Sequence, residues 1–290
     1  MSVGTRHALV FGGSGQVGGA VLARLAAAGW SVDALSRAPR PATPGRRWLV
    51  GGFEAMPALA PGYDAIVSCG PLDRFADWWA AVDIAAPRVV AFGSTSLHAK
   101  RGSADPAERD LAVRLATAEQ RLFAASTARG SDAVVLRPTL VYGAGRDRTL
   151  TRIATLARRR GLFVLPRGAT GLRQPVHVDD LADAALAALQ SAGAGGRGYD
   201  LPGGEALPYR EMVARVLAAL HPPARLIELP APLFSALAAL LRAGGRLQGV
   251  GTQAQARLRE DLVFDPAPAE AALGYAPRAF RPDASMLEPR

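Results

Sequence analysis

Cysteine and histidine are scarce in this chain of 290 residues, which holds one cysteine, Cys69, and four histidines. A single cysteine cannot form an intrachain disulfide, so we expect a reducing compartment, the cytoplasm. Cys69 closes the apolar run 64–69, which favours a small buried side chain over a nucleophile. The histidines, at positions 7, 98, 177 and 221, lack the spacing of metal ligands, so we predict no metal site.

Lysine is scarcer still among the charged residues. Lys100 is the only one, so the formal net charge of +9 comes from arginine. The densest basic cluster, residues 158–160, has no interleaved aromatic residues, which disfavours a nucleic-acid partner. Scattered arginines suit a small-molecule substrate that bears phosphate.

Long apolar runs are absent as well. The most apolar late stretch, residues 231–241, is much shorter than the about 20 residues that a membrane span needs. The first predicted strand begins within about six residues of the start, which leaves no room for a signal peptide. We therefore expect a soluble protein without a membrane span, whose 49% hydrophobic residues can form a large core.

Glycine, in contrast, is concentrated within residues 7–29, which read as strand, tight loop and helix. An apolar run of strand length precedes three glycines at GxxGxxG spacing, and apolar residues then recur as on one face of a helix. A phosphate binds against bare backbone N–H groups at a helix N-terminus, which a glycine loop leaves accessible. The pattern predicts a dinucleotide site, and the alternative is a glycine-rich turn that binds nothing. The predicted cofactor-binding residues here are Gly12, Gly15, Gln16, Val17 and Gly18.

The second predicted strand, residues 30–35, is followed by Ser36 and Arg37. An acidic residue near this position would bind the ribose 2′-hydroxyl of NAD, and Asp33 lies too early to do so. A hydroxyl followed by a guanidinium suits a 2′-phosphate, so we predict NADP in preference to NAD. An ordinary solvated loop residue is the alternative interpretation of Arg37.

Strands and helices alternate over the first 145 residues. Further strands are predicted at 48–50, 64–69, 88–92 and 133–136, and helices at 75–86 and 106–129. This alternation predicts an α/β fold with a doubly wound parallel sheet of the Rossmann type. Cys69, Gly70 and Pro71 end the fourth strand, where backbone lies over a bound cofactor.

The alternation becomes irregular beyond residue 145. Here we predict helices at 149–160, 180–191, 208–220, 232–242 and 252–262, and strands at 162–165, 199–204 and 226–229. The sequence thus predicts a dinucleotide-binding domain, residues 1–145 with a return segment at about 172–192. A smaller, interleaved substrate domain takes up most of residues 146–290.

Five motifs occur in one order along the chain: GGSGQVGG, FGSTS, LRPTLVYG, PVHVDDLA and YDLPGG. In this order they resemble the extended short-chain dehydrogenase/reductase family, the NAD-dependent nucleotide-sugar epimerases and dehydratases. The resemblance spans nearly the whole chain. It implies a Rossmann domain with a smaller C-terminal substrate domain, a tightly bound NAD or NADP, and a nucleotide-diphosphate sugar as substrate.

The proton relay of that family is incomplete in this sequence. The family combines a serine or threonine with Tyr-x-x-x-Lys, in which the lysine lowers the pKa of the tyrosine. Thr95 or Ser94 matches the hydroxyl. Counting back from Glu119 puts Leu111 and Leu115 at the tyrosine and lysine positions, and no Tyr-x-x-x-Lys occurs anywhere. The chain therefore resembles an atypical member.

Three other residues are candidates for the missing chemistry: Lys100 with His98, and His177. Lys100, with His98, lies a few residues beyond Thr95 and would reach a substrate phosphate or hydroxyl, unless it is a solvated loop lysine. His177 would act as acid or base, unless it is a hydrogen-bonded structural histidine.

The resemblance also suggests substrate-binding residues. Arg173 matches a loop that contacts the diphosphate, and its fork of donors fits phosphate. Tyr142 would face the cleft, with packing as the alternative. Arg146 and Arg148 are weaker candidates for the diphosphate contact.

Two functions follow from these observations. The first is an NAD(P)-dependent oxidoreductase or epimerase that acts on a nucleotide sugar or a related small molecule, with Thr95 polarising the substrate oxygen. The second is a non-catalytic NAD(P)-binding sensor or assembly subunit, which the missing tyrosine and lysine favour. A monomer and a homodimer are both compatible with the sequence.

Overall fold

A computed structural model describes residues 5–147, 149–243 and 257–289. The chain divides into two compact units. Unit 1 consists of Met1–Thr139, Val178–Pro202 and Phe264–Pro277, and unit 2 consists of Leu140–His177, Gly203–Val263 and Arg278–Arg290. These bounds differ from the predicted 1–145 and 172–192, because the return to unit 1 extends through an added sheet strand and is followed by a third segment near the end of the chain.

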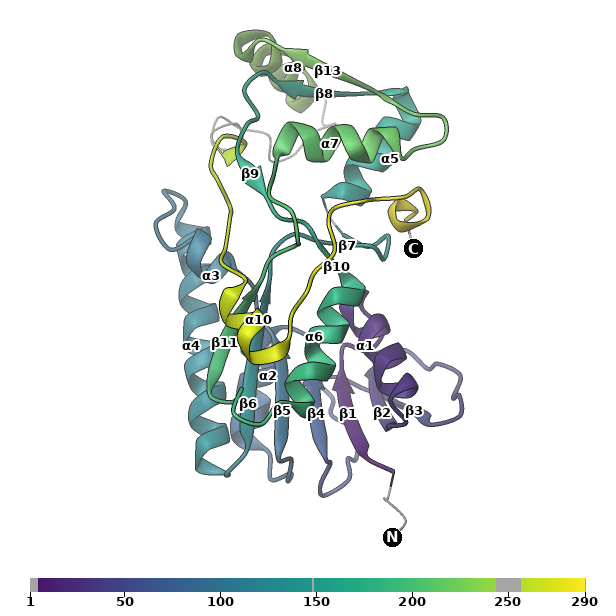
Figure 1. Ribbon diagram of the computed structural model, residues 1–290, viewed down its shortest axis with the longest axis vertical. Coiled ribbons are helices and arrows are strands. Elements are labelled where there is room, and N and C mark those ends of the chain that lie inside the picture. Colours follow the sequence, from purple (N-terminus) through teal and green to yellow (C-terminus); the bar gives the residue numbers. More distant parts are fainter. Residues whose placement is uncertain (1–4, 148, 244–256, 290) are drawn as a thin grey trace. The chain divides into compact units, whose positions relative to one another are not determined.

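Unit 1 is organised around a parallel sheet of seven strands (Figure 1), which confirms the predicted doubly wound α/β fold. β1 pairs with β2 on one side and with β4 on the other, so the strand order reverses between β1 and β4. In sheet order the strands are β11 (Arg197–Leu201), β6 (Asp132–Pro138), β5 (Arg88–Phe92), β4 (Ala65–Ser68), β1 (His7–Phe11), β2 (Ser31–Ser36) and β3 (Arg46–Val50).

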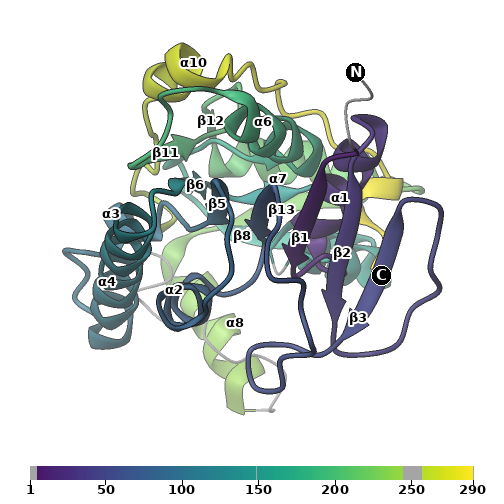
Figure 2. The same ribbon diagram turned by 90° about the horizontal axis from the view of Figure 1, so that it is seen from below.

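Helices cover both faces of this sheet (Figure 2). α1 (Gln16–Ala27) packs against α6 (Val178–Gln190) on one face, and α2 (Leu72–Ala81) packs against α4 (Pro106–Ala128) on the other. A strand covered on both sides needs apolar residues throughout, and Ala8, Leu9 and Val10 of β1 are fully buried.

The core under α2 and α4 is rich in aromatic rings. Trp79 is fully buried, and its Nε1 donates a hydrogen bond of 2.9 Å to the hydroxyl of Ser126. Phe11 of β1 packs edge-on against Phe75 of α2, with ring centroids 5.4 Å apart. This packing holds β1, and the loop that follows it, on a rigid base.

The structure corrects several predicted elements. The helix expected at 75–86 begins at Leu72, which is buried, and ends before Val82, whose backbone is extended. A short helix, α3 (Ser96–Ala99), follows the fifth strand and was not expected. Of the helix expected at 252–262, residues 252–256 lie outside the described residues, and 258–262 form turns and irregular chain.

Unit 2 holds three pairs of short strands and four helices among its described residues. β8 (Leu162–Pro166) pairs with β13 (Arg225–Leu229), β7 (Val141–Tyr142) with β10 (Val176–His177), and β9 (Leu172–Arg173) with β12 (Leu207–Pro208). The helices are α5 (Leu150–Arg160), α7 (Tyr209–Ala218), α8 (Ala231–Ala243) and the 3₁₀ helix η1 (Ser285–Leu287). In unit 1, α10 (Ala267–Leu273) completes the secondary structure.

The described helices of both units fall short of the length and apolar character that a bilayer crossing requires.

Candidate functional site

The glycine loop joins β1 to α1 as the sequence predicts. Gly12 has φ +66, a conformation that side chains disfavour, and its carbonyl accepts a 2.8 Å hydrogen bond from the N–H of Gly15. Gly15 is the N-cap of α1 and provides no side-chain cap. The first N–H groups of α1 therefore point out of an uncapped helix end, where an anion is favoured.

Two of these glycines leave no room for a side chain. A Cβ on Gly12 would lie 2.9 Å from the backbone carbonyl of Cys69, and a Cβ on Gly18 would lie 2.1 Å from the oxygen of Gly12. The loop thus lies against the end of β4, at the point where the strand order reverses. In doubly wound sheets a dinucleotide binds in this crevice, so the geometry fits such a cofactor.

The neighbouring predicted residues surround the same loop. Gln16 and Val17 open α1, and within the described chain the buried Nε2 of Gln16 has no hydrogen-bond partner. Cys69, Gly70 and Pro71 follow β4 directly. Burial raises the pKa of the Cys69 thiol to about 12, so it stays protonated and is no nucleophile at neutral pH.

The end of β2 brings one further arginine beside the predicted pair. Ser36 is buried, and its hydroxyl accepts hydrogen bonds from the N–H of Ala38 at 3.4 Å and from Nε of Arg40 at 3.3 Å. Arg37 and Arg40 are both exposed. Sequence reasoning missed Arg40, although its position three residues after Arg37 in the same loop was a usable signal.

Asp33 points away from this loop, as expected. Both carboxylate oxygens accept from Arg47, at 2.9 and 2.7 Å, and one also accepts from the hydroxyl of Tyr63 at 3.2 Å. Burial by itself raises the pKa of Asp33, but the hydrogen bonds and charge of Arg47, the charge of His7 and the Tyr63 hydrogen bond together lower it. Asp33 is thus an ionised structural carboxylate.

The hydroxyls after β5 are tied to the backbone. Thr95 is 6% exposed, and its Oγ1 donates to the carbonyl of Pro138 at 3.2 Å. Ser94 accepts from the N–H of Ser96 at 3.1 Å. Lys100 ends α3 and pairs with Glu108 at 3.2 Å, so a carboxylate of α4 already compensates its charge.

Leu111 and Leu115 lie on one face of α4, one turn apart. They line a cavity of about 420 Å³ together with Pro71, Leu72, Asp73, Arg74 and Arg114. The positions at which the resemblance expects tyrosine and lysine therefore face the segment that follows β4.

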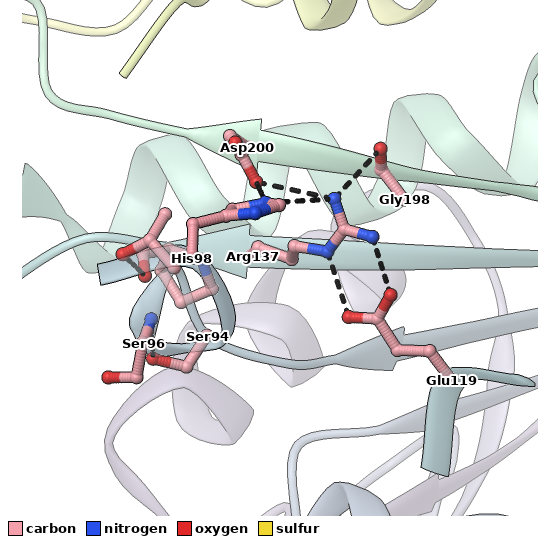
Figure 3. Close-up of polar contacts among 9 residues, drawn as sticks. Ser94, Ser96, His98, Glu119, Arg137, Gly198 and Asp200 are labelled. Atoms are coloured by element: carbon pink, nitrogen blue, oxygen red, sulfur yellow. Dashed lines mark hydrogen bonds and ion pairs between the residues drawn. The ribbon is translucent and has the colours of Figure 1, made fainter. Parts of the chain in front are cut away.

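A polar network at the end of β6 was not foreseen from the sequence (Figure 3). Arg137 donates from Nε and Nη2 to the two carboxylate oxygens of Glu119, at 2.8 and 2.5 Å. Its Nη1 lies 3.4 Å from Asp200 Oδ1 and 3.4 Å from His98 Nε2. The hydrogen bond with Glu119, opposed in part by burial, raises the pKa of Arg137, which stays charged.

Three predicted residues of unit 2 are largely buried in the structure, and the roles that the resemblance gives them stay predictions. Arg173 is 7% exposed and donates to the backbone carbonyls of Leu172, Glu260 and Arg257, at 2.6–2.7 Å. Both of its terminal nitrogens thus bind backbone of unit 2. Burial also lowers the pKa of this guanidinium.

Tyr142 and His177 are the other two. Tyr142 is 1% exposed, and its ring packs edge-on against His177, with centroids 5.1 Å apart. His177 is 5% exposed, and a Cβ on Gly143 would lie 2.4 Å from its Nε2. Both side chains are therefore largely enclosed within unit 2, and their roles stay predictions. Of the weaker candidates, Arg146 is exposed, and Arg148 lies outside the described residues.

Comparison with curated proteins gives partial matches. A 2-alkyl-3-oxoalkanoate reductase of Stenotrophomonas maltophilia is 34% identical over 116 residues, which are 39% of this chain and 34% of that protein. The mitochondrial NADH dehydrogenase (ubiquinone) 1 alpha subcomplex subunit 9 of Arabidopsis thaliana is 31% identical over 109 residues, 37% of this chain and 27% of that protein. The matches thus span about a third or less of each curated relative.

Comparison with solved structures extends the likeness to nearly the whole chain. The structure of MoeE5 in complex with UDP-glucuronic acid and NAD superposes with a TM-score of 0.68 at 19% identity, covering 94% of each chain. At this identity the likeness establishes the fold.

The family itself is given by a sequence model. Residues 73–201, which run from the start of α2 to the end of β11, match the NAD dependent epimerase/dehydratase family. This match confirms the resemblance that the ordered motifs indicate. The chain is therefore similar to the NAD dependent epimerase/dehydratase family over residues 73–201, which are less than half of its length.

Proposed function

We propose that the protein is an NAD(P)-dependent oxidoreductase or epimerase that acts on a nucleotide sugar or a related small molecule bearing phosphate. The observation that carries this proposal is the glycine loop. The loop leaves the N-terminus of α1 uncapped, beside the point where the strand order of the sheet reverses. At Gly12 and Gly18 the loop packs so closely against neighbouring backbone that a Cβ would not fit.

The substrate class follows from chemistry and from relatives. A family of epimerases and dehydratases acts by moving a hydride between a nicotinamide and a carbon that bears oxygen, and MoeE5 was solved with a UDP sugar and NAD. The net charge of +9 favours an anionic substrate.

For the cofactor we propose NADP over NAD. Ser36, Arg37 and Arg40 would hold the 2′-phosphate, since two exposed guanidiniums flank a buried hydroxyl there. Asp33, the nearest acid of the strand, is bound to Arg47 and is not free to hold a 2′-hydroxyl. Replacing Arg37 and Arg40 together by alanine should weaken NADPH binding about tenfold or more and leave NADH binding unchanged.

Thr95 would contact the reacting oxygen of the substrate. Its hydroxyl donates a hydrogen bond to the carbonyl of Pro138, so the lone pairs of Oγ1 stay available to accept from a substrate hydroxyl. Ser94 and Lys100 remain predictions for this region. The single cysteine supports a cytoplasmic location, and a monomer and a homodimer both stay open.

Turnover is the test of this function. The purified protein is mixed with NADPH or NADH and a panel of nucleotide-diphosphate sugars and ketosugars, and nicotinamide absorbance and sugar NMR spectra are followed. We expect cofactor oxidation, or interconversion of sugar epimers, with one member of the panel. Tight cofactor binding without turnover across the panel would contradict the enzyme and favour a cofactor-binding sensor or subunit, the role that Leu111 and Leu115 suggest.

A further inference from the structure

We infer that His98, oriented by Asp200, transfers the proton to and from the substrate oxygen in place of the tyrosine that this chain lacks. The inference rests on the proposed function. It assigns a proton-transfer group that neither the family match nor the motifs supply.

His98 lies near Thr95 in the chain and is linked to α4 through Arg137. His98 lies in α3, three residues after Thr95, and its N–H donates to the carbonyl of Thr95 at 3.0 Å. Leu111, Leu115 and Glu119 follow one another at four-residue spacing and thus share one face of α4. Glu119 holds Arg137, and Arg137 in turn contacts His98.

The contacts of His98 define which ring nitrogen is available. Nε2 lies 3.4 Å from Asp200 Oδ1 and 3.4 Å from Arg137 Nη1. A carboxylate only accepts and a guanidinium only donates, so Nε2 donates to Asp200 when it carries a proton and accepts from Arg137 when it does not. Figure 3 shows the Arg137 guanidinium between Glu119 and this pair. Nδ1, one carbon away in the same ring, belongs to a side chain that is 43% exposed.

The charged groups beside the ring come from three elements. Glu119 from α4 and Asp200 from β11 supply two negative charges, and Arg137 from β6 supplies one positive charge. From the third segment, the uncharged ring of Phe264 faces His98, with centroids 6.3 Å apart.

The tyrosines of the chain offer no substitute. In unit 1, three tyrosines are buried and each hydroxyl donates a hydrogen bond within the fold. Tyr63 donates to Asp33, Tyr199 to the carbonyl of Ala194, and Tyr275 to the carbonyl of Pro202. Of the two tyrosines in unit 2, Tyr142 is 1% exposed, and the ring of Tyr209 packs under the guanidinium of Arg173, which lies 5.5 Å from the ring centroid. His98 combines an exposed side chain with an orienting carboxylate and follows Thr95 in the chain.

The proposed step balances as a carbonyl reduction. The reduced nicotinamide, when bound, supplies the hydride and its two electrons to the carbonyl carbon. The C=O π pair moves onto the oxygen, and that oxygen takes the proton from Nδ1 of His98, which gives an alcohol and a neutral imidazole. The Nε2–H group keeps donating to the carboxylate of Asp200, and a proton from solvent then restores Nδ1–H. In the oxidation direction the same atoms move in reverse.

A first test needs no turnover. In the free protein at mildly acidic pH, a hydrogen-bonded imidazole N–H of His98 should give a downfield proton resonance that is absent from H98Q and D200N. H221Q, a change at an exposed histidine of unit 2, should keep it. A spectrum in which D200N leaves the His98 resonance unchanged would overturn the pairing on which the inference depends.

The second test measures turnover with the substrate found for the wild-type protein. H98Q should lower kcat about 10²–10⁴-fold at unchanged NADPH affinity, and the fall in rate toward high pH should disappear. D200N should lower kcat less, since it leaves the imidazole in place. If H98Q keeps the parent rate and pH profile while the wild type turns over, the inference is wrong and the oxidoreductase stands. If the wild type neither oxidises the cofactor with any member of the panel nor interconverts sugar epimers, the proposed function fails, and the inference fails with it.

Discussion

At the scale of single residues, unit 1 pairs two of its buried carboxylates with arginine. Asp33 and Glu119 are 2% and 5% exposed, and each accepts two hydrogen bonds from one arginine. Removing one member of such a pair leaves a charge without its partner in a place that water hardly reaches, and this costs far more than losing an exposed pair.

Glu119→Gln tests that cost at the polar network. The substitution leaves the guanidinium of Arg137 charged and largely buried, so we expect the free energy of unfolding in urea to fall by about 3 kcal/mol. Asp77→Asn breaks the exposed ion pair with Arg121 and serves as the control, with an expected change of about 0–1 kcal/mol. If the two substitutions lower the free energy of unfolding equally, the buried Glu119–Arg137 pair is no more important for stability than an exposed pair.

Asp33→Asn tests how much Asp33 contributes to the loss of stability at low pH. The folded pKa of Asp33 lies below its unfolded value, so its contribution is complete above about pH 4 and is lost as pH falls through the folded pKa. We expect the variant to be about 2 kcal/mol less stable at neutral pH and to lose less stability on acidification. Urea unfolding at several pH values measures both, and an acid limb as steep as that of the wild type would refute the assignment.

At the scale of elements, the strand–loop–helix unit β1–α1 could be read from the sequence almost completely. Its glycines occur where the backbone must turn or approach another strand, and local spacing records that need. The Arg137 network could not be read in this way. Its members come from α3, α4, β6 and β11, and only the register of the parallel sheet brings them together.

The same limit applies to the side-chain contacts of unit 2. The motif around Arg173 predicts a phosphate contact, but the carbonyls that its guanidinium binds belong to residues 257 and 260, far along the chain. Burial of Tyr142 and His177 likewise depends on packing that no local spacing records. Helices and strands with strong periodicity were predicted well. Contacts between side chains and residues far away along the chain were not predicted.

Gly18→Ala tests the close approach within the β1–α1 element. The added Cβ would meet the oxygen of Gly12 at 2.1 Å, so the loop must open, and we expect nicotinamide-cofactor binding to be lost together with about 2 kcal/mol of stability or more. Gly19→Ala is the matched control in the next position of the same helix, where nothing lies within 4 Å of the new Cβ. That variant should bind normally and gain about 0.5–1 kcal/mol from helix propensity. Normal cofactor binding by Gly18→Ala would count against the loop as the site.

At the scale of the whole molecule, each unit is assembled from distant segments of the chain. Residues 264–277 belong to unit 1, where the hydroxyl of the buried Tyr275 donates to the carbonyl of Pro202 at 2.7 Å. Residues beyond 278 belong to unit 2 and supply Phe280 and Leu287 to its core. The end of the chain is therefore part of both cores.

Shortening the chain tests this assembly. A chain that stops at Val263 should lack cooperative thermal unfolding, because both units lose buried side chains, whereas a chain that stops at Glu288 should unfold like the parent. Tyr275→Phe is the milder variant, with an expected loss of about 1–2 kcal/mol from an unsatisfied carbonyl. A cooperative transition at the parent temperature in the chain that stops at Val263 would show that the segments are dispensable.

Titration of the purified protein with NADPH and NADH, followed by nicotinamide fluorescence, tests whether the glycine loop binds a nicotinamide dinucleotide. We expect saturable binding of both cofactors, tighter for NADPH, which Gly19→Ala retains and Gly18→Ala loses. Binding of neither cofactor by the wild-type protein would contradict this prediction, and the loop would then be a feature of the fold alone.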